Sequence, residues 1–131
     1  MRSFLGILAG FFTVPIVSVC CDLAFHAIHP AYGTGVYIDG GMALIVMIYG
    51  NLSVLLGGYV TGMISRGHYV RNGLILGILG LLIAAPVHIF KIWHLWPVWF
   101  HIADLLLVVP VAILGAHLAG KRRQNSEAVA A

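Results

Sequence analysis

Carboxylate and imidazole side chains recur at helical spacing in two apolar segments of the chain. Asp22 and His26 are four residues apart, and His29 follows three residues later. At 100° per residue, this spacing places the three side chains on one helical face. His101 and Asp104 are three residues apart and also share a face. Such groups can hydrogen-bond to one another, exchange protons or bind a divalent metal.

Two of these acidic residues require polar partners inside a membrane. A rise of 1.5 Å per residue from the expected outer helix ends puts Asp22 and Asp104 both about 10 Å below the outer interface. An aspartate at the centre of a span costs about 2.5–3.5 kcal/mol on insertion scales, so neither side chain is expected to face lipid. We therefore predict a polar cluster inside the bundle, made of Asp22, His26, His88, His101 and Asp104, with Lys91 one turn beyond His88. Asn51 or Tyr49 of the second span is expected to reach the cluster from below.

Four kinds of chemistry suit such a cluster, and the spacing leaves all four open. The first is architectural, with hydrogen bonds that fix how the helices pack. The second is a Zn²⁺, Fe²⁺ or Mn²⁺ site with Asp22, His26, His101 and Asp104 as ligands. The third is a proton relay or the gate of a small transporter. The fourth is a haem held between two histidines, although the chain has no c-type attachment motif.

Motifs of hydrolytic enzymes are missing from the sequence. The chain has no Gly-x-Ser-x-Gly, no His-Glu-x-x-His and no phosphate-binding glycine loop. A Cys-x-x-Cys pair of the kind used by thiol oxidoreductases is also missing. The sequence therefore favours a protein that is not an enzyme.

The composition predicts an integral membrane protein. Of the 131 residues, 61% are hydrophobic and 8% are charged, whereas a soluble domain has roughly 45–50% apolar and about 25% charged residues. Four apolar runs, each close to the 20 residues that a span needs, lie at about 4–28, 40–64, 73–92 and 98–119. We predict an all-α, four-helix membrane bundle in a single domain, 1–120, followed by a basic flank and a disordered tail, 121–131.

The flanks of the spans predict the orientation and the interfaces. Six basic residues fall on one side of the membrane and one, Lys91, on the other; the six are Arg2, Arg66, Arg71, Lys121, Arg122 and Arg123. Basic loops stay in the cytoplasm, so both termini are expected there. This arrangement explains the net charge of +3 better than binding to nucleic acid does. Trp93, Trp96 and Trp99 are expected at headgroup level on the outer side.

Glycines at four-residue spacing predict close helix packing. Small residues let membrane helices approach each other, either within one bundle or between subunits. The glycines in question are Gly6 and Gly10 in the first span, Gly58 and Gly62 in the second, and Gly73 and Gly77 in the third. A homo-oligomer or a larger membrane complex is therefore a possible setting, with the lipid bilayer as the immediate partner.

Three segments carry a resemblance to a known group of proteins. Cys-Asp-Leu-Ala-Phe-His at 21–26, Gly-Gly-Tyr-Val-Thr-Gly at 57–62 and Trp-Pro-Val-Trp-Phe-His at 96–101 resemble the corresponding parts of small four-span bacterial inner-membrane proteins to which no activity is assigned. The resemblance implies fold and location only. Together with the residues above, it favours a non-enzymatic accessory or assembly subunit. The alternative is a small transporter or metal-handling protein that uses the cluster.

Overall fold

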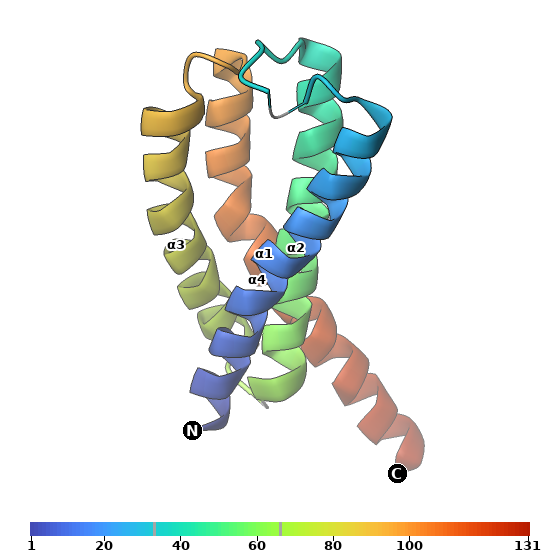
Figure 1. Ribbon diagram of the computed structural model, residues 1–131. Coiled ribbons are helices and arrows are strands. Elements are labelled where there is room, and N and C mark those ends of the chain that lie inside the picture. Colours follow the sequence, from blue (N-terminus) through green and yellow to red (C-terminus); the bar gives the residue numbers. More distant parts are fainter. Residues whose placement is uncertain (33, 66) are drawn as a thin grey trace.

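The computed structural model is a bundle of four helices, and it describes residues 1–32, 34–65 and 67–131 (Figure 1). The helices are α1 (Arg2–Ile28), α2 (Gly40–Ser65), α3 (Tyr69–Val87) and α4 (Val98–Ala130), and α3 continues into a π-helical turn, η1 (His88–Ile92). All four, with η1 counted as part of the third, are long and apolar enough to cross a membrane. The described residues contain no β-strand. The predicted all-α fold with four membrane-spanning helices is confirmed.

Helix α2 lies between α1 and α4. It packs closely against both of them, and α4 also packs closely against α3, whereas α1 and α3 touch each other much less. In Figure 1, α1 crosses in front of the other helices at an angle, and the two termini lie at the same end of the bundle. The loops 29–39 and 93–97 lie at the opposite end, called the outer end below.

Glycines line the three close helix contacts. A Cβ atom on Gly62 would lie 2.5 Å from the backbone oxygen of Ala116, and one on Gly77 would lie 2.8 Å from the Cα of Val109. Real Cβ atoms do not approach this closely, so larger side chains would separate these helices. The structure places the six glycines that were predicted to pack helices in these contacts: Gly6 and Gly10 against α2, Gly58 and Gly62 against α4, and Gly73 and Gly77 against α4.

A small apolar core closes the outer end of the bundle. It consists of Ile38, Ala43, Trp96 and Phe100. The Ile38 amide donates to the Leu95 carbonyl oxygen at 2.7 Å, which joins the two outer loops. Trp96 is 9% exposed, because its ring stacks on Phe100 with the centroids 4.6 Å apart. Trp96 therefore turns its ring into the bundle at the outer end, where it packs in the apolar core.

The C-terminal segment differs from the disordered tail that was predicted. Helix α4 continues without a break to Ala130. Arg123 Nε lies 3.0 Å from a carboxylate oxygen of Glu127 four residues later, and the Ser126 hydroxyl donates to the Arg122 carbonyl oxygen at 3.1 Å. Ion pairs at this spacing stabilise a helix, and alanine and arginine are strong helix formers. The segment therefore extends the fourth helix beyond its apolar part.

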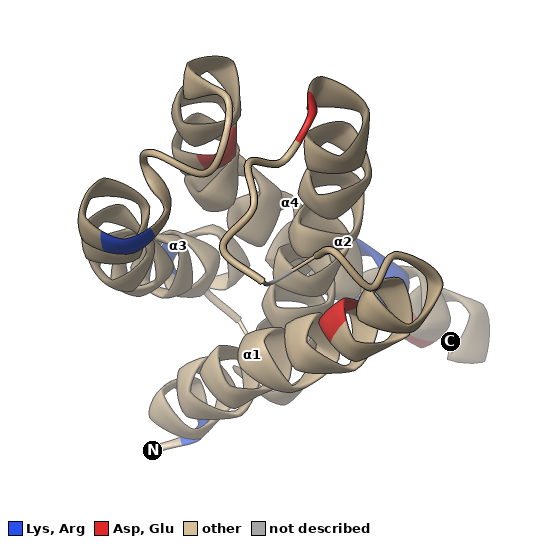
Figure 2. Ribbon diagram, turned by 45° about the horizontal axis from the view of Figure 1, so that its top comes forward, with Lys and Arg blue, Asp and Glu red and all other residues tan. Residues whose placement is uncertain are grey.

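Charged residues are sparse over the whole bundle (Figure 2). The basic residues near the ends of α1, α3 and α4 are Arg2, Arg71 and Lys121–Arg123, which the helix order brings to the end that holds both termini. Lys91, in η1, lies toward the outer end. Arg66, which was predicted to belong to the same basic side, lies outside the described residues.

Candidate functional site

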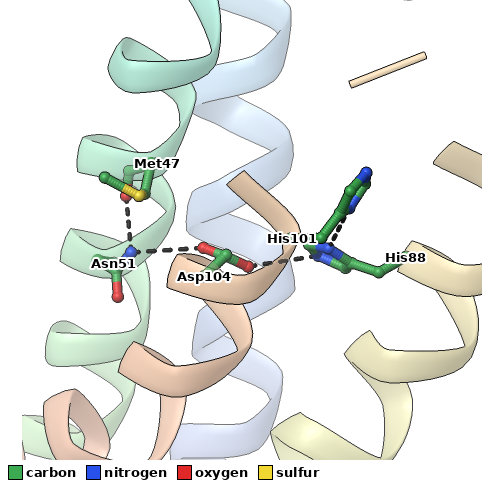
Figure 3. A network of polar contacts seen from close by, with 5 residues as sticks. All are labelled: Met47, Asn51, His88, His101 and Asp104. Carbon is green, nitrogen blue, oxygen red and sulfur yellow. Dashed lines mark hydrogen bonds and ion pairs between the residues drawn. The ribbon is translucent and has the colours of Figure 1, made fainter. Parts of the chain in front are cut away.

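Asp104 is the centre of a polar network in the outer half of the bundle (Figure 3). Its Oδ2 atom lies 3.3 Å from Nε2 of His88, and its Oδ1 atom accepts a hydrogen bond of 3.4 Å from the Asn51 side-chain amide. The same amide donates to the Met47 carbonyl oxygen at 2.8 Å. Because these residues come from α2, η1 and α4, the network joins three parts of the bundle.

His88 connects Asp104 to a second histidine. The Nδ1 atoms of His88 and His101 are 2.9 Å apart, so one of them donates and the other accepts. His101 is fully buried, and His88 is 6% exposed. Phe100 stacks on the His88 ring at a centroid distance of 5.7 Å, and Trp93 stacks on the His101 ring at 4.8 Å. We call Asn51, His88, His101 and Asp104 the Asp104 network.

The π-helical turn η1 begins at His88, two residues after Pro86. Proline has no backbone N–H and interrupts the hydrogen bonding of a helix. The His88 amide is shared between the carbonyl oxygens of Ala84 and Ala85, at the point where the α-helix gives way to the wider π-helical turn. Turns of this type are often found at functional positions. The widened turn thus sets the position from which the His88 side chain reaches Asp104.

Asp22 lies in a separate network with two tyrosines. The Tyr32 hydroxyl donates to Asp22 Oδ1 at 2.9 Å, and the Tyr49 hydroxyl donates to the same oxygen. The two hydroxyl oxygens are 3.2 Å apart. His26 is exposed, and its Nδ1–H donates to the Tyr32 carbonyl oxygen at 2.6 Å. These four residues, the Asp22 network, join α1, the loop 29–39 and α2.

The surroundings of Tyr32 keep its hydroxyl protonated. Burial raises the pKa of Tyr32 from 10.0 to about 12; the hydrogen bond to Asp22 and the charge of that carboxylate also raise it, while the hydrogen bond with Tyr49 acts in the opposite direction. The Tyr32 ring also packs edge-on against Phe25 and Trp96. The phenol is therefore a permanent donor that fastens the outer loop to α1.

The side chains predicted to converge are divided between the two networks. Asp22 and His26 belong to the Asp22 network, and His88, His101 and Asp104 belong to the Asp104 network. The reason is the central position of α2. Tyr49 and Asn51 are two residues apart, hence about 200° apart around that helix, so that Tyr49 reaches α1 while Asn51 reaches α4. Among the described residues, Asp22 and Asp104 share no hydrogen-bond partner.

The positions of Lys91 and Tyr32 were not predicted correctly from the sequence. Lys91 is exposed and forms no ion pair with any described residue, so it does not join the Asp104 network. Tyr32 was not among the residues predicted to form the cluster, yet its hydroxyl binds Asp22. The sequence gives no signal for this contact, because it depends on how the loop 29–39 folds back over the bundle.

The predicted metal and haem ligands are not arranged as such centres require. Asp22 and His26 lie in one network, and His101 and Asp104 lie in the other. No group of three or more His, Cys, Asp or Glu side chains in the described part of the chain is placed to hold a metal ion. The rings of His88 and His101 hydrogen-bond directly to each other through their Nδ1 atoms.

Comparisons of the chain with protein-family models, with curated proteins and with solved structures found no match. The resemblance to small four-span bacterial membrane proteins therefore stays a prediction.

Proposed function

We propose that this chain is a non-enzymatic accessory or assembly subunit of a membrane complex. The observation that supports the proposal is that Asp22 and Asp104, within the spans, form polar contacts with neighbouring helices. Asp22 binds Tyr49 on the neighbouring α2, and Asp104 binds Asn51 on α2 and His88 on η1. Polar contacts of this kind between membrane helices contribute about 0.6–2 kcal/mol each. In this interpretation, the polar residues within the spans stabilise the packing of the helices.

A lateral groove between α1 and α3 supplies a surface for assembly. A cleft of about 220 Å³ lies there, with Phe11 of α1 and Ile83 of α3 in its walls and the half-buried small residue Gly80 among its lining. Small residues let another membrane helix approach closely. In a two-fold dimer, the same surface patch of both subunits meets and must be self-complementary. Two copies of this groove facing each other would leave a space between them. We therefore assign it to an apolar transmembrane helix of a different subunit.

The distribution of charge supports an orientation with both termini in the cytoplasm. Arg2, Arg71 and Lys121–Arg123 gather toward one end of the bundle, and Lys91 lies toward the other. Basic residues are retained on the cytoplasmic side of bacterial inner membranes. In this orientation, the two polar networks lie in the outer half of the membrane.

Site-specific crosslinking in intact bacterial membranes tests the assembly surface. A photoreactive residue at position 83, in the groove, is expected to give one discrete product with a second membrane protein, identified by mass spectrometry. The same group at position 106, where Leu106 is 70% exposed, is the matched control and should give no such product. Gly80→Leu, which fills the groove, should abolish the product, whereas Gly50→Leu, at an open position of α2, should leave it unchanged.

Three results would contradict this function. They are crosslinks from position 83 only to lipid, a product made only of two copies of this chain, and a product that Gly80→Leu does not affect.

A further inference from the structure

We propose that His88, His101 and Asp104 form a site that binds a single proton from the outer side of the membrane. The inference rests on the hydrogen bonds of the Asp104 network and, for the side of the membrane, on the orientation proposed above; it does not depend on the assembly surface. In Figure 3 the three side chains form a continuous chain of contacts, from Asp104 through His88 to His101.

The contacts fix where the protons lie in the state with an ionised Asp104. A carboxylate only accepts hydrogen bonds, so Nε2 of His88 carries the proton that points to Asp104. A neutral imidazole has one N–H, and hence Nδ1 of His88 accepts and Nδ1 of His101 donates. Nε2 of His101 is then left without a proton. That atom is buried and makes no hydrogen bond in the described part of the chain, while the backbone of Trp93 and Trp96 near the His101 ring favours a protonated imidazole.

An added proton can therefore bind at one nitrogen and be passed along the chain of contacts. It forms an N–H bond at Nε2 of His101. The Nδ1 proton of His101 then moves to Nδ1 of His88, and the Nε2 proton of His88 moves to Oδ2 of Asp104. Each step breaks one bond to hydrogen and forms another. Both hydrogen bonds persist with reversed direction, and the charge of the three side chains changes from −1 to zero.

Partial burial favours the uptake of this proton, because the side chain of Asp104 is 18% exposed and that of His88 is 8% exposed. An unbalanced charge is costly in a low-dielectric interior, and a buried group tends to neutralise instead. The groups that face the network are uncharged: α2 contributes the Asn51 amide, and the aromatic rings of Trp93 and Phe100 cover the two imidazoles. Lys91, on η1, is exposed and has no ion pair with the described residues. No neighbouring cation therefore balances the carboxylate of Asp104.

The position of the network indicates which side supplies the proton. His101 lies in the first turn of α4, directly below the outer loop 93–97. Trp93 of that loop covers the His101 ring and is itself 40% exposed. At its other end, the network stops at the Asn51 amide, which does not carry protons at neutral pH. Proton uptake and release therefore use the same outer side, so the site binds a proton without conducting it across the membrane.

Solid-state NMR of the ¹⁵N-histidine-labelled chain in lipid vesicles tests the proposal on the unaltered protein. Imidazole nitrogens with and without a proton give well separated signals. As the outer pH is lowered, Nε2 of His101 should gain its proton in the same titration step in which Nε2 of His88 loses one. Persistent protonation of His101 Nε2 over the whole pH range, or no linked change at His88, would overturn the site.

Infrared difference spectroscopy identifies the final acceptor of the proton. The wild-type chain should gain the band of a protonated carboxyl group in the same step, and Asp104→Asn should lose that band. Asp22→Asn is the matched control and should retain it, because Asp22 lies in the other network. Retention of the band in Asp104→Asn would contradict the proposal. Because neither measurement involves a partner protein, failure of the proton site is distinguishable from failure of the assembly function.

Discussion

The contact between α2 and α4 should be disrupted by a single methyl group at Gly62. In Gly62→Ala, the new Cβ would lie 2.5 Å from the Ala116 backbone oxygen and 2.7 Å from the Ala119 Cβ, whereas ordinary contact begins at 3.4 Å. The distance to the Ala116 oxygen is thus about 0.9 Å shorter than an ordinary contact. Because this oxygen belongs to the backbone, it cannot rotate away, and the helices must separate. Overpacking of this type costs about 1–3 kcal/mol, and the large shortfall favours the upper end.

A glycine elsewhere on the same helix provides the control. Alanine is a better helix former than glycine by about 1 kcal/mol, which reduces the net loss at Gly62 to about 2 kcal/mol. Gly50 also lies in α2, and no atom lies within 4 Å of the position that its Cβ would occupy. Gly50→Ala should therefore keep the helix-propensity gain of up to about 1 kcal/mol. The two variants should differ in unfolding free energy by about 3 kcal/mol.

Unfolding in mixed detergent micelles with increasing dodecyl sulfate measures this difference. Tryptophan fluorescence reports the transition, because Trp96 is packed in the outer core. Equal stability of the two variants, or a more stable Gly62→Ala, would refute the close approach of α2 and α4.

The other contacts make three predictions. Tyr49→Phe removes one of the two hydroxyls that donate to Asp22 and should cost about 0.6–2 kcal/mol of unfolding free energy; Tyr37→Phe, at a phenol 61% exposed, should cost nothing, and equal effects would contradict the bond. The pKa of about 12 for Tyr32 predicts that the stability this contact supplies is complete below pH 10 and is lost as the pH rises through 12. The difference between the absorbance titrations of the wild-type chain and of Tyr32→Phe measures the pKa of Tyr32. A midpoint near 10 would contradict the burial of the Tyr32 hydroxyl. Asp39→Ala removes the side-chain acceptor from the first turn of α2 and should cost about 0.5–2 kcal/mol in the same unfolding assay; Asp39→Asn should recover most of the loss, and failure to do so would show that the cap contributes little.

The elements of the fold were largely predictable from local sequence. Apolar runs of sufficient length predicted the four helices, and the predicted starts of the second and fourth, residues 40 and 98, agree with the structure. The three-residue spacing of His101 and Asp104 predicted that both face the interior, and both take part in the Asp104 network. These features depend on the period of a helix, which the sequence contains directly.

The spatial order of the helices was not predictable in the same way. Equal depth in the membrane suggested that Asp22 and Asp104 meet, but depth along a helix does not say which helices are neighbours. Helix α2 packs against both α1 and α4 and keeps the two carboxylates apart. The contact of Tyr32 with Asp22 depends on the path of a loop, and the buried position of Trp96 depends on the stacking of its ring on Phe100. None of these is encoded by residue spacing.

The uninterrupted fourth helix determines how the C-terminal segment meets the cytoplasm in the proposed orientation. From Ala119 to Ala130 it rises about 16 Å at 1.5 Å per residue. Near the start of this stretch, an Arg122 guanidinium nitrogen donates to the Tyr59 hydroxyl at 2.8 Å, which links it to α2. A stiff rod anchored in this way holds its tip at a constant height over the bilayer surface. A fluorophore attached at Val129 would thus report a narrow range of distances to a dye in the headgroups.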